Sequence, residues 1–249
     1  ILPTPIPEKG IILNNVSNYW FKKFNKLVDS HLTDISIENL KINDEEYEQV
    51  EGRSVVVKKL KALPIESIVR NYLIGSGYSD YLSNGSICGI DLPSNLKMAS
   101  KLPELLFTPS SKAEIGDHDI NISFEKMSKL IGQDISDKIK KISFDIFERA
   151  SDYLKTKNII LADTKFEFGL CNNGNLVLID EILTPDSSRF WISESYQEGI
   201  SPASLDKQFI RDYVKSISWN DSMPPPELPE DIVEKTFEKY KDLNKILMD

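Results

Sequence analysis

Two apolar runs separated by a short turn-forming segment constrain the fold more than any other feature of this sequence. Ile159–Leu170 and Leu176–Ile182 are strand-like runs, and Asn172-Asn173-Gly174-Asn175 lies between them. Asn and Gly adopt the left-handed conformations that tight hairpin turns need, so the pattern predicts an antiparallel hairpin. Apolar spacing within Ser123–Ile131 and Ile135–Lys155 predicts two helices that cover its sheet.

Further segments complete an expected α+β fold. A dense β-branched run marks Ser54–Leu60 as a buried strand that Pro64 ends. Prolines and weak periodicity predict that Leu92–Asn121 is mostly loop, and a long ordered loop in a compact domain is usually functional. The other expected helices are Asn14–Leu32, a segment around Leu205–Ile217, and Pro229–Leu247.

Alternation along the hairpin separates a charged face from an apolar one. Lys165 and Glu167 share one face, while Phe166 and Phe168 share the other. A four-residue loop would place Asp180 opposite Glu167, and two carboxylates beside a lysine would then suit Mg²⁺. A five-residue loop would place Asp180 opposite Phe166 instead. A solvated face with cross-strand ion pairs remains the alternative.

The chain that follows the hairpin carries charged groups suited to anions. Glu181, Asp186 and Arg189 come directly after the second strand. Arginine offers two parallel N–H donors to a phosphate or a carboxylate. We therefore predict anion contacts at Arg189, for which an ordinary surface position is the alternative.

A second candidate anion site combines Arg70 with the small-residue turn Gly75-Ser76-Gly77. Backbone N–H groups in such a turn can bind a phosphate. The segment matches neither the dinucleotide-binding nor the phosphate-loop fingerprint. A plain turn therefore stays open as the alternative.

A third candidate is the polar loop Phe107–Ser123, which contains Lys112, Glu114, His118 and Asp119. An isolated His beside an Asp is often a helix cap or a surface pair. The functional and the structural interpretations carry equal weight here. No nucleophile, base and orienting group come together in the sequence as a covalent catalytic set.

Composition excludes several classes of protein. A formal net charge of −9 over 249 residues argues against nucleic acid binding, and no apolar run is long enough to span a bilayer. Cys88 and Cys171 lack partners at metal-ligand spacing, so we expect free thiols in a reducing, cytoplasmic compartment. Ile1–Pro7 has no basic region or cleavage site, so no signal peptide is expected.

Several blocks, taken in order, resemble the phosphoribosylaminoimidazole-succinocarboxamide (SAICAR) synthetase family over nearly the whole chain. They include Ile6-Pro7-Glu8-Lys9-Gly10, Val57-Lys58-Lys59-Leu60, Val69-Arg70-Asn71-Tyr72, Phe107-Thr108-Pro109-Ser110, Ala162-Asp163-Thr164-Lys165-Phe166-Glu167-Phe168-Gly169, Thr184-Pro185-Asp186-Ser187-Ser188-Arg189-Phe190-Trp191 and Asp206-Lys207-Gln208-Phe209-Ile210-Arg211-Asp212-Tyr213.

This resemblance implies a two-lobed α+β fold with a kinase-like ATP cleft between a small β-rich lobe and a larger α+β lobe. Residues 1–60 would be the remainder of the small nucleotide-binding lobe, and residues 61–249 the larger substrate- and metal-binding lobe with C-terminal helices. Family members normally begin with a further nucleotide-covering hairpin, so we expect part of the ATP site to be missing from this chain.

The resemblance also implies the chemistry. ATP would phosphorylate the carboxylate of carboxyaminoimidazole ribotide, and the amine of L-aspartate would displace phosphate to form SAICAR and ADP. The enzyme would be an ADP-forming carbon–nitrogen ligase of purine biosynthesis, a monomer or small homo-oligomer. Another phosphoryl-transfer enzyme of this architecture and a silent nucleotide-binding module remain alternatives.

Site residues carry over from the matching positions. Glu167 and Asp180 would hold Mg²⁺ and contact ATP, and with Lys165 they form the expected catalytic group. The adenine would meet the backbone of Lys58, Lys59 and Leu60. Arg70, Ser76 and Arg189 would meet the phosphate and carboxylate of the ribotide. Further substrate contacts, not divided between ribotide and aspartate, would be Lys112, His118, Asp119, Asp186, Lys207 and Arg211.

Overall fold

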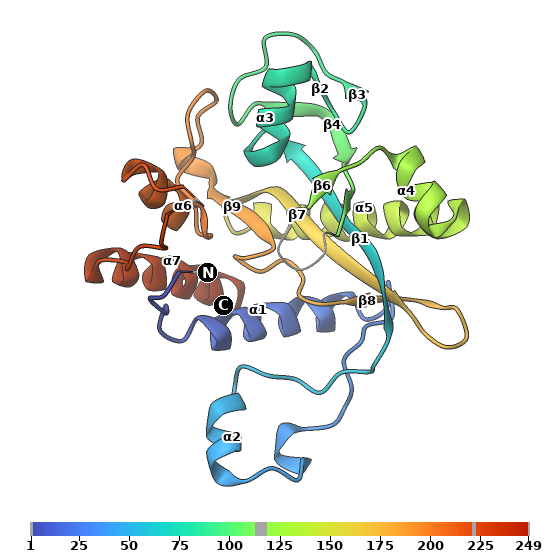
Figure 1. The fold of residues 1–249 in the computed structure, drawn as a ribbon, viewed down its shortest axis with the longest axis vertical. Helices are drawn as coiled ribbons and strands as arrows, with labels where there is room; N and C mark the ends of the chain where they lie inside the picture. Colours follow the sequence, from blue (N-terminus) through green and yellow to red (C-terminus); the bar gives the residue numbers. More distant parts are fainter. Residues whose placement is uncertain (1, 113–118, 221–222, 249) are drawn as a thin grey trace.

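The fold is built on an antiparallel sheet, seen at the centre of Figure 1. The computed structural model describes residues 2–112, 119–220 and 223–248. Within these ranges the order is β6-β5-β1-β7-β8, with β4 also on β1 and β9 also on β7. The strands are β1 Lys61–Tyr72, β4 Lys101–Phe107, β5 Ser110–Ser111, β6 Ile120–Asn121, β7 Ile159–Leu170, β8 Leu176–Ile179 and β9 Ser188–Ile192.

Helices surround this sheet, so the expected α+β class is confirmed. The helix α5 lies against β7 and β1 with α4 beside it, and its apolar face buries Ile146, Phe147 and Ala150. The predicted helices 123–131 and 135–155 are therefore confirmed. The helices are α1 Lys9–Phe24, α2 Asp44–Val50, α3 Gly75–Asn84, α4 Phe124–Ile131, α5 Gln133–Lys155, α6 Gln208–Ser216 and α7 Glu230–Met248.

The strand expected over Ser54–Leu60 is wrong. The strand β1 begins at Lys61 and continues through Pro64, while Val55 and Val57 are 38% and 43% exposed. Pro64 fits because the pairing of β1 with β7 shifts register between Ala62 and Glu66. Proline, which lacks an N–H donor, is tolerated at such an irregularity.

The expected loop over Leu92–Asn121 is also partly wrong, since β4, β5 and β6 lie within it. The strand β4 pairs with β1 alone, so it is an edge strand that accommodates Pro103. Two-residue strands such as β5 and β6 are too short to leave an alternating pattern. The small hairpin β2 Ser86–Ile87 and β3 Ile90–Asp91 packs near α3.

The N-terminal segment differs from the β-rich segment expected over 1–60. Residues 2–60 contain α1, α2 and a short 3₁₀ helix Ile37–Asn39, and their β pairing is limited to isolated bridges. The helix α1 ends at Phe24, and Leu27 and Val28 pack against the core from the turn that follows. Because Val16 and Trp20 lie in the same core as the sheet, α1 belongs to the main body. The boundary at residue 60 stays a prediction.

The two ends of the described chain meet beside the sheet. The helices α1 and α7 pack against each other, and Figure 1 draws both termini next to them. Leu243 and Leu247 of α7 are buried in the same core as Trp20. No helix of the described part is long and apolar enough to cross a membrane.

Candidate active site

The carboxylate of Asp180 reaches the charged face of the hairpin, but not through the strand register that the sequence predicted. Glu167 pairs with Ile179, so the loop has the five residues 171–175 and the register that faces Asp180 with Glu167 is wrong. The strand β8 ends at Ile179, and Asp180 has a left-handed φ of 63°. Asp is among the residues that adopt this conformation most readily. Strand alternation therefore stops at Asp180, and its carboxylate lies 3.7 Å from Lys165 Nζ.

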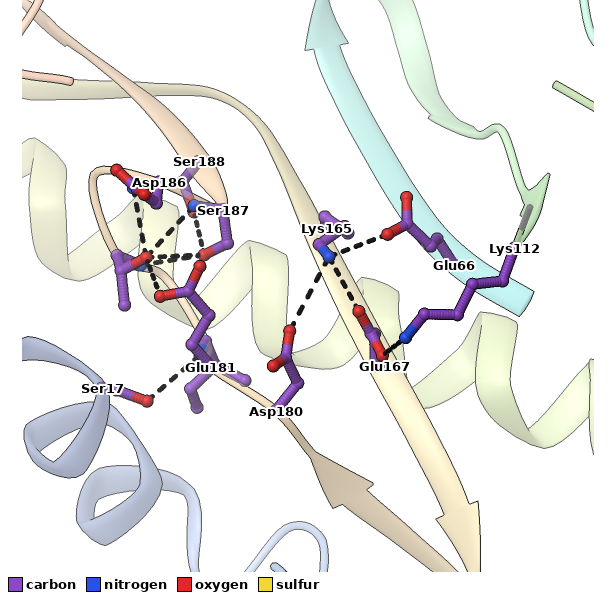
Figure 2. A network of polar contacts seen from close by, with 12 residues as sticks. Ser17, Glu66, Lys112, Lys165, Glu167, Asp180, Glu181, Asp186, Ser187 and Ser188 are labelled. Carbon is purple, nitrogen blue, oxygen red and sulfur yellow. Dashed lines mark hydrogen bonds and ion pairs between the residues drawn. The ribbon is translucent and has the colours of Figure 1, made fainter. Parts of the chain in front are cut away.

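Lys165 is the centre of this cluster, as Figure 2 shows. Its Nζ donates to Glu66 Oε1 and Glu167 Oε1, each at 2.8 Å. Glu66 lies on β1 directly across from Glu167 and is 8% exposed. Sequence reasoning missed Glu66, although period-two alternation along β1 places it on the same face as Arg70.

The charges of the cluster respond to burial and to one another. Burial alone would raise the pKa of Glu167, but hydrogen bonds from Lys112 and Lys165 outweigh it and keep that pKa below its usual value. The carboxylates of Glu167 and Glu66 likewise raise the pKa of Lys165 against the effect of its burial. Lys165 is therefore a charged lysine, unsuited to act as a base.

Asp180 has the opposite character. Burial, and then the negative charge of Glu167, raise the pKa of the Asp180 carboxyl. Its side chain is 45% exposed, so a cation from solvent can reach it. Two neighbouring carboxylates with one raised pKa form a site with excess negative charge, which a divalent cation would relieve.

The donor set fits Mg²⁺ bound together with phosphate. Among the described residues, no three or more His, Cys, Asp and Glu side chains are arranged as a complete metal site. Magnesium, however, usually keeps several waters and needs only one or two carboxylates plus substrate phosphates. Glu167 and Asp180 supply two such carboxylates.

A row of three charged residues crosses the sheet beside this cluster. Asp163 of β7 pairs with Arg70 of β1 on one side and with Arg189 of β9 on the other. Asp163 Oδ2 accepts hydrogen bonds from both guanidinium groups. Arg70 also donates to Ser76 Oγ at 3.0 Å and to Thr108 Oγ1 at 2.9 Å. The structure thus joins the two arginine candidates through Asp163, which sequence reasoning did not single out.

A cavity of about 330 Å³ lies over these groups. Its lining includes the catalytic candidate Lys165 and most of the predicted substrate residues, namely Arg70, Ser76, Asp119, Asp186, Arg189, Lys207 and Arg211. Glu66, Asp163 and Asp206 add acidic groups to its lining. This size is at the lower end of the range for small-molecule sites.

Two cations of this cavity form no ion pair with an acidic side chain among the described residues. In the described part of the chain, the side chains of Lys207 and Arg211 form no ion pair, whereas Arg189 is paired with Asp163. Burial lowers the pKa of both Lys207 and Arg211. Lys207 and Arg211 are therefore the groups best placed to receive an anionic ligand.

A second cavity, of about 280 Å³, borders the same cluster at Asp180. Asp180 and Glu181 lie in its lining, together with Leu13, Phe21, His31, Leu32, Arg53 and Val55. Asp180 thus lines the second cavity while Lys165, 3.7 Å away, lines the first. The charged cluster therefore lies between the two cavities.

Other predicted residues lie outside the two cavity linings or outside the described residues. Lys58, Lys59 and Leu60 lie outside the linings of these two cavities, and the Lys58 N–H donates to the His31 carbonyl. Their contact with adenine stays a prediction. His118 lies outside the described residues. Lys112 contacts Glu167 directly and so belongs to the cluster.

Comparison with known proteins places the chain in a family. A family model described as SAICAR synthetase matches residues 1–226. The phosphoribosylaminoimidazole-succinocarboxamide synthase of Thioalkalivibrio sulfidiphilus is 50% identical over 242 residues, which cover 97% of this chain and 82% of that protein. That of Haemophilus influenzae is 50% identical over 247 residues, which cover 99% and 85%.

A solved structure is similar as well. The SAICAR synthase of Saccharomyces cerevisiae, solved in complex with SAICAR, superimposes with a TM-score of 0.87 at 40% identity. The match covers 98% of this chain and 82% of the yeast chain. With a family model spanning most of the sequence and relatives at half identity, this chain belongs to the SAICAR synthetase family.

Proposed function

We propose that this chain joins L-aspartate to carboxyaminoimidazole ribotide with ATP, giving SAICAR, ADP and phosphate in purine biosynthesis. Membership of the family supports the reaction. The observation in the structure that carries it is the pair of cavities that meet at Lys165 and Asp180. A phosphoryl donor in one cavity and an acceptor in the other would face each other across this cluster.

The first cavity is the proposed ribotide and aspartate site. Arg189, with Arg70 and Ser76 beside it, would bind the phosphate or carboxylate of the ribotide, because guanidinium groups bind such oxyanions in a bidentate manner. Lys207 and Arg211 carry charge that no described acidic side chain pairs with, so they suit the carboxylates of the substrates. Asp119 and Asp186 line the same space.

The second cavity is the proposed nucleotide site. Leu13, Phe21, Leu32 and Val55 offer apolar surface for a base. Lys58, Lys59 and Leu60 follow Val55 along the chain toward β1, and their backbone is our proposed adenine contact. Phosphates extending from this cavity toward Asp180 would reach the cluster.

The side chains of the cluster position phosphate and neutralise its charge. Glu167 and Asp180 would hold Mg²⁺, which when bound neutralises charge on the phosphates of ATP. Lys165, kept protonated by Glu66 and Glu167, would place a positive charge beside the transferred phosphoryl group. Lys112 holds the second oxygen of Glu167.

The bonds formed and broken need no protein nucleophile. An oxygen of the ribotide carboxylate attacks the terminal phosphorus of ATP, and ADP leaves. The aspartate amine then attacks the carbonyl carbon of the acyl phosphate, phosphate leaves, and the amine loses a proton. Catalysis of phosphoryl transfer rests mainly on positioning and charge stabilisation. We further propose that the enzyme works in the cytoplasm as a monomer or small homo-oligomer.

Substrate-dependent release of ADP tests this function. Purified protein with ATP and Mg²⁺ is expected to release ADP only when both the ribotide and L-aspartate are present. ADP release with a different acid in place of aspartate would favour another phosphoryl-transfer enzyme. Binding of ADP without any turnover, and unaffected by Glu167→Ala, would favour a silent nucleotide-binding module.

A further inference from the structure

The carboxylate of Asp186 is held from both ends of the chain. Tyr240 Oη of α7 donates to Asp186 Oδ1 at 2.8 Å, and Lys9 Nζ of α1 lies 2.8 Å from Asp186 Oδ2. Lys9 Nζ also lies 5.7 Å from the centroid of the Tyr240 ring. Both oxygens of a cavity-lining carboxylate thus have partners from outside the cavity lining.

Tyr240 is a rigid, neutral donor at this contact. Its side chain is fully buried, at 0% exposure. Burial, and then the charge of Asp186, raise the pKa of the Tyr240 hydroxyl, so it keeps its proton throughout the working range of pH. Tyr240 lies beyond residues 1–226, the part matched by the family model. The helix that carries it is anchored by Leu243 and Leu247 in the main core.

The position of Asp186 affects the two unpaired cations of the cavity. The negative charge of Asp186 raises the pKa of Lys207, opposing the larger effect of burial, and it acts on Arg211 in the same direction. The carboxylate is therefore close enough to influence both. Its two oxygens face Tyr240 and Lys9, and among the described ion pairs none joins Asp186 to Lys207 or Arg211.

We propose that Tyr240 and Lys9 are positioning residues for the substrate cavity. They hold Asp186 away from Lys207 and Arg211, so that these cations stay available to the anionic groups of a substrate. An Asp186 side chain without these partners would turn toward the nearest cations and compete with the substrate for them. This inference rests on the proposed function, because it takes the cavity as the site of the ribotide and aspartate.

Tyr240→Phe tests the proposal, because it removes the donated hydrogen bond and keeps the ring. Loss of a hydrogen bond to a charged group is expected to raise the KM of the ribotide or of aspartate about tenfold. The KM of ATP should stay within about twofold, since the second cavity is not lined by Asp186. Lys9→Met should act in the same direction with a smaller effect, because Lys9 is 33% exposed.

Tyr153→Phe is the matched control. Tyr153 Oη donates at 3.4 Å to the carbonyl of Leu247, which lies on α7, the helix that carries Tyr240. Tyr153 does not contact Asp186. It should change the Tm without changing any KM. If Tyr240→Phe lowers the Tm and leaves both acceptor KM values unchanged, Tyr240 is only structural and the proposal is overturned.

A binding measurement separates this inference from the proposed function. Calorimetric titration with inorganic phosphate and with L-aspartate needs no turnover. Weaker binding by Tyr240→Phe than by Tyr153→Phe supports the positioning role even if the unmodified protein lacks ligase activity. Equal binding by both variants contradicts it even if the ligase activity is present.

Discussion

Asp163 joins Arg70 to Arg189, since its Oδ2 accepts a hydrogen bond from Nη1 of each arginine, at 2.9 Å and 2.6 Å. The three residues lie on adjacent strands and form a row across the sheet. Arg70 is 2% exposed and Asp163 is 3% exposed. The arginines that would bind the ribotide are therefore oriented by a buried carboxylate.

Asp163→Asn should destabilise the protein strongly. It removes the negative charge that two largely buried guanidinium groups share, and breaking such a pair costs about 3 to 5 kcal/mol. Urea unfolding measures the loss. Asp231→Asn is the control, because the Asp231–Lys235 pair has side chains 62% and 59% exposed. A change there within about 1 kcal/mol is expected, and an equal loss in both variants would contradict the role of burial.

Gly75→Ala should displace Arg189. Gly75 has a φ of +60°, and a Cβ there would lie less than 2.5 Å from Arg189 Nη2. Gly85→Ala provides the same backbone strain, with φ +69° and open space around the added Cβ. Both changes should cost about 1 to 2 kcal/mol of stability.

The two glycine variants should differ in their effect on the KM of the ribotide. Gly75→Ala alone should raise the KM of the ribotide, by about tenfold or more, because the guanidinium loses its position. Steady-state kinetics with varied ribotide measures this. A similar rise for Gly85→Ala would show that backbone strain, and not the contact with Arg189, is responsible.

Glu167→Gln should raise the concentration of Mg²⁺ that the activity requires. The expected result is that about tenfold more Mg²⁺ is needed for half-maximal ADP release, because one of two carboxylate ligands is lost. Glu66→Gln is matched to it, since Glu66 also lies 2.8 Å from Lys165. Glu66 is not among the groups that shift the pKa of Asp180. The Mg²⁺ concentration that the Glu66→Gln variant requires should therefore stay close to that of the unmodified protein.

Asp180→Asn should stabilise the metal-free protein at neutral pH. The pKa of Asp180 is raised in the folded protein, so the carboxyl opposes folding increasingly as the pH rises above the ordinary aspartate pKa, and fully once the pH exceeds the raised pKa. The gain in Tm over the unmodified protein should vanish toward about pH 3, below the ordinary aspartate pKa, where the carboxyl is protonated in both the folded and the unfolded state. Asn also accepts the left-handed backbone at this position.

The same variant should lose the stabilisation that Mg²⁺ with ADP gives the unmodified protein. Thermal unfolding across a pH series, with and without Mg²⁺ and ADP, measures both effects. If Asp180→Asn lowers the Tm of the metal-free protein at pH 7, the raised pKa does not describe Asp180. If it keeps the full ligand effect, Asp180 is not a metal ligand.

Local patterns in the sequence determined the elements that are long and periodic. The hairpin from Ile159 was predictable because Asn and Gly mark its turn, and α4 and α5 were predictable because their apolar residues recur at helical spacing. Alternation also separated Lys165 and Glu167 from Phe166 and Phe168, which are buried in the core. The family and its reaction were recognisable from blocks of residues in order.

The tertiary structure decided the rest, because the decisive interactions join residues far apart in the chain. A left-handed backbone at Asp180, and not the register of the hairpin, turns its carboxylate toward Lys165. Glu66 becomes a site residue only because its strand, β1, pairs with β7. Asp163 becomes one only because its strand, β7, pairs with both β1 and β9. No local pattern encodes such pairing.

The ends of the chain illustrate the same limit most clearly. Lys9 and Tyr240 are separated by most of the sequence, and neither lies in a pattern that points to Asp186. They meet it because α1 and α7 bury apolar faces against one core, which brings both polar groups to the same carboxylate. The sequence by itself determined the chemistry present in the site, and packing decided which groups hold one another in place.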